Sequence, residues 1–97
     1  MYAVIFKAEI NKIDNTYFEK ANHMRELAIS KYGCVEFTST SEGNHEIAIS
    51  YWKSKEDISA WKEDKDHKKA QVLGKNKWYK AYTVQIVEIL HEYCSTE

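Results

Sequence analysis

The spacing of apolar and polar residues changes several times along this chain. Residues 2–10 alternate between two faces, which is the two-residue period of a β-strand. After a polar connection, apolar residues recur at helical spacing from Thr16, which predicts a helix of about four turns. These residues are Tyr17, Ala21, Met24 and Ala28, with Phe18 and Leu27 widening the stripe. Gly33 suits the left-handed position that ends such a helix.

The middle of the chain predicts a β-hairpin. Alternation resumes at Val35 and continues through Phe37. Residues 41–44 are a Ser-Glu-Gly-Asn cluster that is typical of a turn, and the alternating run 45–52 follows it. The second run is therefore expected to return antiparallel to the first.

The second half of the chain predicts two short helical segments and a closing strand. Ser54, with an Asp three residues later, resembles a capping box and begins the first segment. Asp66 is expected to cap the second segment, which stops at Gly74. Residues 75–79 are expected to form a loop with Trp78 facing inward, and residues 82–90 alternate as the last strand.

This order of elements predicts an α+β fold. Strand, helix, strand, strand, helical region and strand is the split βαβ or ferredoxin-like plan, with a four-stranded antiparallel sheet in a single domain of residues 1–97. Helices can cover only one face of such a sheet, and the strands carry a surplus of Val, Ile and aromatic residues for the other face. A second copy packed sheet against sheet is therefore expected, and it would add burial that a short chain lacks.

The formal net charge of −1 hides an asymmetry. Lys53–Lys80 carries nine Lys against five acidic residues, a local charge of +4. Either this segment attracts an anionic ligand, or its lysines coat the solvent faces of helices. It contains no Arg for bidentate recognition of phosphates or bases, so no nucleic-acid partner is expected.

Localisation is expected to be cytoplasmic. The longest uncharged apolar runs, such as Tyr2–Phe6, are far shorter than the roughly 20 residues of a membrane span, and the N-terminus lacks the pattern of a signal peptide. We therefore expect a soluble protein with no membrane partner. Cys34 and Cys94 have no metal-ligand spacing and are expected to be reduced thiols.

Several segments together resemble the antibiotic biosynthesis monooxygenase domain family. They are the strand Tyr2–Phe6, the segments Gly33–Phe37, Ile49–Trp61 and Asp66–Ala70, and then Gly74 and Trp78. The resemblance covers nearly the whole chain, and it implies a dimeric α/β barrel made of two ferredoxin-like subunits. Some members oxygenate aromatic polyketides without a prosthetic group or metal, and others degrade haem.

Two departures disfavour haem degradation. Haem-degrading members place an axial His ten residues after the Trp that corresponds to Trp61, where this chain has Gln71. They also carry an Asn near the end of the first strand, where this chain reads Phe6-Lys7-Ala8.

His67 and Gln71 are the predicted catalytic residues. An imidazole that titrates near neutral pH can accept a substrate proton or ligate iron. On a helix His67 and Gln71 lie one turn apart on one face, so Gln71 would hold the substrate oxygen. The alternative for His67 is a structural histidine near a helix N-terminus, for example one bonded to a backbone carbonyl. Large apolar side chains are predicted to line a substrate pocket, with ordinary core packing as their alternative. These substrate-binding candidates are Trp61, Trp78, Phe6, Phe37 and Met24.

These features and the resemblance predict a homodimeric, cofactor-independent monooxygenase for a small planar, phenol-like or quinol-like molecule. No metal site is expected, because His23, His45 and His91 are not spaced with other ligands. One alternative is a non-catalytic small-molecule-binding or stress-related dimer. The second alternative is a haem-degrading monooxygenase.

Overall fold

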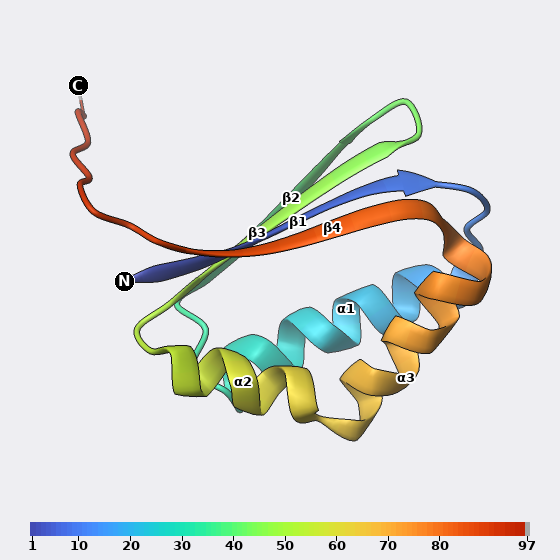
Figure 1. The fold of residues 1–97 in the computed structure, drawn as a ribbon, viewed down its shortest axis with the longest axis horizontal. Coiled ribbons are helices and arrows are strands. Elements are labelled where there is room, and N and C mark those ends of the chain that lie inside the picture. The colour runs from blue at the N-terminus through green and yellow to red at the C-terminus, as the bar shows by residue number, and fades with distance from the viewer. Residues whose placement is uncertain (97) are drawn as a thin grey trace.

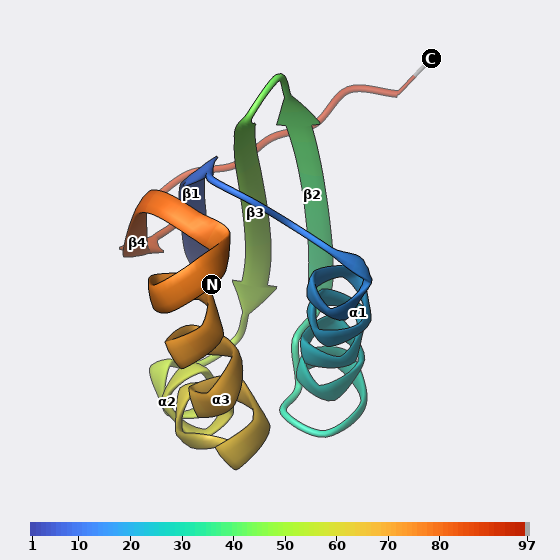
Figure 2. The same ribbon diagram turned by 90° about the vertical axis from the view of Figure 1, so that its right-hand side faces the viewer.

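The computed structural model describes residues 1–96, which form one antiparallel sheet with its helices on a single face (Figures 1 and 2). The elements in chain order are β1 (Tyr2–Ile10), α1 (Asn15–Ser30), β2 (Glu36–Glu42), β3 (His45–Trp52), α2 (Lys55–Glu63), α3 (Lys65–Leu73), the π-helical turn η1 (Gly74–Trp78) and β4 (Tyr79–Glu88). The four strands within the described residues lie in the order β2-β3-β1-β4, and each neighbouring pair is antiparallel. The predicted ferredoxin-like α+β fold is confirmed.

Polar side chains begin each of the three α-helices among the described residues. Asp14 caps α1 and Ser54 caps α2, each accepting a hydrogen bond from the backbone N–H three residues later, at 3.0 and 3.1 Å. The predicted start at Ser54 is confirmed. The prediction that Asp66 caps α3 is wrong, because Asp64 has the non-helical backbone and accepts the Asp66 N–H at 2.8 Å.

The loop predicted for residues 75–79 is also wrong. The chain continues from α3 directly into η1, and Trp78 is buried as expected, with 3% of its surface exposed. Gly74 permits this connection because a Cβ there would lie 2.6 Å from Cε2 of Tyr79. The close approach of the Tyr79 ring therefore requires glycine. The last strand ends at Glu88, so Leu90 lies beyond it and is 87% exposed.

The core lies between the sheet and the helices. Seven buried residues form one cluster: Val4, Met24, Ala28, Cys34, Trp52, Ile58 and Trp61. Trp52 and Ile58 are its largest fully buried side chains. Both described cysteines are unpaired thiols, with Cys34 buried and Cys94 exposed. The N-terminal half of α2 thus packs on the end of β3 and holds this end of the fold together.

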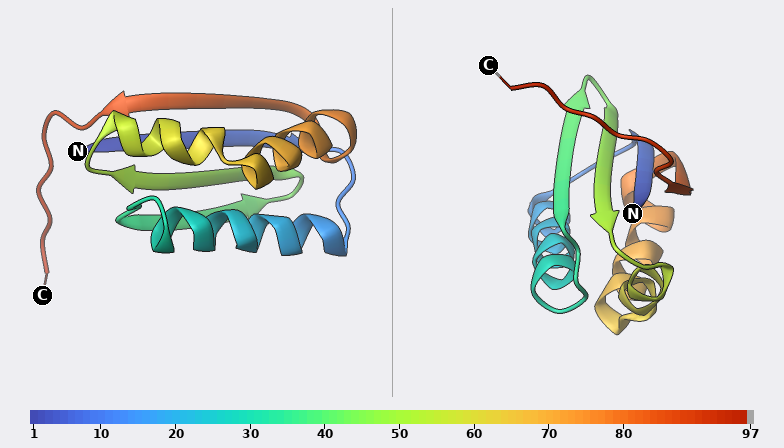
Figure 3. Two further views of the ribbon diagram at one scale, coloured as in Figure 1. Left: turned by 90° about the horizontal axis from the view of Figure 1, so that it is seen from below. Right: turned by 90° about the vertical axis from the view of Figure 1, so that its left-hand side faces the viewer.

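Strand β4 is uncovered on both faces beyond its first residue, Tyr79. It lies at an edge of the sheet, beside the helices and not beneath them (Figure 3). Its helix-facing residues Tyr82, Val84 and Ile86 are 42%, 42% and 46% exposed. The opposite face of the sheet carries an apolar group, which we call the outer patch, and no described element covers it (Figure 1). The outer patch consists of Ala3, Ile5, Ile47, Ile49, Tyr51 and Val87.

None of the helices formed by residues 1–96 has the length and apolar character needed to span a bilayer.

Candidate functional site

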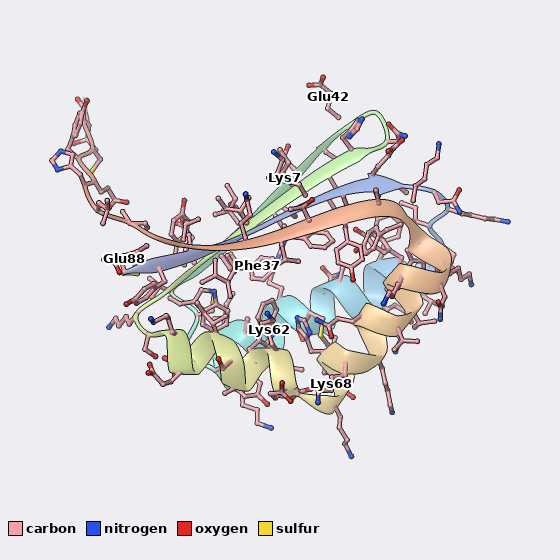
Figure 4. The ribbon with its side chains drawn as sticks, in the orientation of Figure 1. Lys7, Phe37, Glu42, Lys62, Lys68 and Glu88 are labelled. Atoms are coloured by element: carbon pink, nitrogen blue, oxygen red, sulfur yellow. The ribbon has the colours of Figure 1, made fainter. Side chains whose placement is uncertain are left out.

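Trp61 is the centre of an aromatic group between the sheet and the helices, which we call the Trp61 group. Its ring meets the ring of His67 edge to face at 4.4 Å and that of Phe37 at 6.1 Å, centroid to centroid. It also packs on Trp52 at 5.2 Å, and its Nε1 donates a hydrogen bond to the Met24 carbonyl at 3.2 Å. Figure 4 shows Phe37 on the helix side of the sheet. The fold therefore brings together four of the predicted site residues: Trp61, His67, Phe37 and Met24.

The imidazole of His67 is the polar member of this group. Its Nδ1 is buried and has no hydrogen-bond partner within residues 1–96, so the backbone-bonded alternative is not seen for this atom. Burial, reinforced by the charge of Lys62, lowers the pKa of His67 to about 4, against a smaller opposing effect of Asp64. The ring is therefore neutral at physiological pH and is able to exchange a hydrogen bond with a buried ligand.

The remaining predicted residues lie elsewhere. Gln71 follows His67 by one turn of α3, and its side chain is exposed. Phe6 packs against Tyr79 at 5.3 Å, and Trp78 packs against Tyr17 at 5.2 Å. Phe6 and Trp78 thus belong to a second aromatic group at the other end of the helix-facing surface, which also includes Tyr82.

This second group contains an acid and two tyrosines that sequence reasoning missed. The buried Tyr17 hydroxyl donates a hydrogen bond to Oε2 of Glu46. Burial, and then this hydrogen bond, raise the pKa of Tyr17, while burial raises the pKa of Tyr79 to about 12. The sequence feature that points to this group is Glu46. This acid lies on the same face of β3 as Ala48 and Ser50, and that face turns toward the helices.

The Trp61 group is closely packed. Two open hollows mark the surface, one of about 460 Å³ between α1 and α3 and one of about 360 Å³ that reaches the outer side of the sheet. Neither is lined by Trp61, His67 or Gln71. Within residues 1–96, no three His, Cys, Asp or Glu side chains are grouped in a way that would hold a metal ion.

Comparison with solved structures identifies the fold. A protein named antibiotic biosynthesis monooxygenase superposes with a TM-score of 0.78 at 13% identity, over 94% of this chain and all of that one. SnoaB of Streptomyces nogalater, a cofactor-independent oxygenase, gives 0.78 at 8% identity over 94% of each chain. Other neighbours with this fold are named as proteins of unknown function. The fold is therefore that of the antibiotic biosynthesis monooxygenase family, as the sequence predicted.

Sequence comparison identifies a relative. The uncharacterized protein YqjZ of Bacillus subtilis is 33% identical over 89 residues, which is 91% of this chain and 78% of that protein. The chain belongs to the same family as YqjZ. No family model matches the sequence.

Proposed function

We propose that this protein is a cofactor-independent monooxygenase that binds a small phenol-like or quinol-like aromatic molecule beside Trp61. The observation that carries the proposal is the buried, unpartnered Nδ1 of His67 next to the Trp61 ring. A buried polar atom without a partner costs about 1–3 kcal/mol, which a ligand hydroxyl would recover. The fold that the chain shares with SnoaB supports the same class of chemistry.

The Trp61 group favours a planar aromatic ligand. Trp61 and Phe37 offer ring faces and edges for offset or edge-to-face contacts. The neutral His67 accepts a hydrogen bond at whichever ring nitrogen is unprotonated, and a phenol hydroxyl is a good donor. A ligand would enter by displacing side chains that pack on Trp61, with Gln71 at the exposed end of α3 holding a substrate oxygen.

Proton transfer to His67 would then form an ion pair. An isolated imidazolium is unfavourable here, because burial and Lys62 both disfavour it. A phenolate alongside it supplies the opposite charge and raises the imidazole pKa. The phenolate, which carries negative charge on a ring carbon, passes an electron to dioxygen. The resulting radical pair forms a C–O bond, and loss of water leaves a quinone, so one substrate and one O₂ give one quinone and one H₂O.

The variant His67→Phe, which keeps an aromatic ring and removes both nitrogens, would test this proposal. Oxygen uptake with dihydroxynaphthalenes is expected to fall by about 10²–10⁴-fold, the usual contribution of a general base. In the wild type, kcat/KM is expected to stay level from pH 8 down to about pH 5, because the free His67 has a pKa of about 4. Lys68→Ala, an exposed change one residue away, is the matched control. Unchanged uptake in both His67→Phe and Gln71→Ala removes the mechanism.

A non-catalytic binding protein is the second candidate, and the close packing around Trp61 favours it. Neither open hollow reaches His67, so the site does not hold a ready-made pocket. Saturable binding of 1-naphthol, followed by tryptophan fluorescence, without any oxygen uptake would support this candidate. A sharp one-to-one haem titration that is lost in His67→Phe would instead revive haem degradation.

We also propose that the outer patch joins two copies of the chain. Ile5 and Ile49 are cross-strand partners at its centre, and the exposed β4 continues the apolar surface to the sheet edge. Ile49→Asp is expected to convert a dimer to monomers by sedimentation equilibrium, because a charge would be buried between the sheets. Ile29→Asp, at an exposed apolar position on α1, is expected to leave the dimer intact. A wild-type protein that is monomeric at micromolar concentration contradicts the proposal.

A further inference from the structure

The hollow between α1 and α3 has the composition of a binding groove for an amphiphile. Its volume of about 460 Å³ lies within the range of small-molecule sites. Val72 and Leu73 of α3 line it, together with Lys20 of α1 and Lys68 and Lys69 of α3. The two helices lie side by side (Figure 2), and Lys68 projects from α3 into solvent (Figure 4). Lysine side chains of this kind contribute apolar methylene stems to a groove and place their ammonium groups at its rim.

Among the described residues, two of the three lysines that line this groove are not part of an ion pair. The Lys20 and Lys69 ammonium groups have no carboxylate within ion-pair distance among residues 1–96. Two acids of this region are engaged elsewhere, since Glu63 pairs with Lys68 at 2.7 Å and Asp66 pairs with His23 of α1 at 2.9 Å. Val72 remains 58% exposed, which leaves an apolar surface in the same groove as these lysines.

We propose that the α1/α3 groove binds a free single-chain amphiphilic anion, such as a medium-chain carboxylate. The hydrocarbon chain lies on Val72, Leu73 and the lysine stems, and the carboxylate lies between the Lys20 and Lys69 ammonium groups. An amphiphilic cation would meet like charges at the rim, and a neutral amphiphile would gain only the apolar contact. No residue of the Trp61 group lines the groove, so this site is independent of the proposed oxygenase chemistry.

Calorimetric titration with a series of carboxylates tests the apolar half of the proposal. Octanoate, decanoate and dodecanoate below their micelle concentrations are expected to bind with rising affinity, by at most about fourfold for each methylene that the groove buries. Dodecanoate is expected to bind about threefold to tenfold more tightly than dodecyl maltoside, and dodecyltrimethylammonium more weakly than either. Val72→Asp is expected to weaken the binding of all three carboxylates. The variant should fold because Val72 is exposed.

Charge reversal tests the polar half. The double variant Lys20→Glu/Lys69→Glu is expected to lower the affinity for dodecanoate about tenfold and to change the affinity for dodecyl maltoside by less than about twofold. Lys75→Glu on η1, outside the groove, is the matched control and is expected to change neither. The oxygen uptake assigned to His67 is expected to be unaffected by any of these variants, which separates the two proposals.

Three results would overturn the proposal. The first is equal affinity for dodecanoate and dodecyl maltoside, or no binding of either. The second is dodecanoate binding that perturbs the NMR signal of the Trp61 indole and leaves the Val72 and Leu73 methyl signals unchanged. The third is tight binding to vesicles of anionic phospholipid without binding of free dodecanoate, which would mark a membrane-facing surface.

Discussion

Replacing Trp52 by alanine is expected to lower the free energy of unfolding by about 3–5 kcal/mol. The Trp52 side chain is fully buried at the end of β3, packs on Trp61 at 5.2 Å, and donates its indole N–H to Ser50 Oγ at 2.9 Å. Truncation removes a fully buried indole ring from the core and leaves Ser50, itself 3% exposed, without its donor. Urea denaturation followed by far-UV circular dichroism measures the loss.

Ile29→Ala is the matched control for Trp52→Ala. Ile29 is 50% exposed near the end of α1, so its truncation is expected to change stability by no more than about 0.5 kcal/mol. Trp52→Phe is expected to fall between the two, because it keeps an aromatic ring. A loss below about 1.5 kcal/mol for Trp52→Ala would contradict the assignment of Trp52 to the centre of the core.

Acidification from pH 7 to pH 4 is expected to remove about 2–3 kcal/mol of stability through His67 alone. In the unfolded chain this group titrates near its ordinary pKa of 6.5, whereas the folded protein lowers that pKa to about 4. Between these values the unfolded chain binds the proton and the folded chain does not, so stability rises with pH across this window. The contribution is complete above pH 6.5 and is lost as pH falls towards 4.

The measurement is the difference between two pH profiles of urea stability, wild type minus His67→Phe. Subtraction removes the contribution of carboxylates such as Asp14 and Asp64. Hydrogen bonds lower their pKa values, so their protonation in acid also destabilises the fold. His91→Phe is the control at an exposed position outside the sheet and helices. A profile of His67→Phe that is parallel to the wild type between pH 4 and 6.5 would show that His67 is solvated.

Most helices and strands of this chain could be predicted from the sequence because the patterns that define them involve residues close together in the chain. The cap at Ser54 and the alternation in β1 and β3 depend on residues a few positions apart. The failures occurred where a distant contact decides. Asp64 begins α3 in place of Asp66, and its other carboxylate oxygen accepts the hydroxyl of Tyr32 at 2.5 Å from the loop after α1. Residues 75–78 belong to a π-helical turn that begins at Gly74, where the missing side chain lets the Tyr79 ring pack closely.

The candidate site was likewise only partly predictable from the sequence. Aromatic side chains of the right size are visible in the sequence, but their grouping depends on which strands become neighbours. Phe37 reaches Trp61 because β2 pairs with β3, whereas Phe6 on β1 packs against Tyr79 and Tyr82 of β4. The Tyr17–Glu46 hydrogen bond joins residues 29 positions apart, which no local pattern predicts.

The order of elements and the ferredoxin-like plan could be predicted from the sequence alone, because these follow from the spacing of apolar residues and from caps a few residues long. The packing of the helices, which the sequence does not show, leaves His67 half-buried with Nδ1 unpartnered against Trp61, while Gln71 faces solvent. Helical spacing gives both residues the same face, but their burial depends on how α2 and α3 pack, since Trp61 covers one turn of that face and leaves the next exposed.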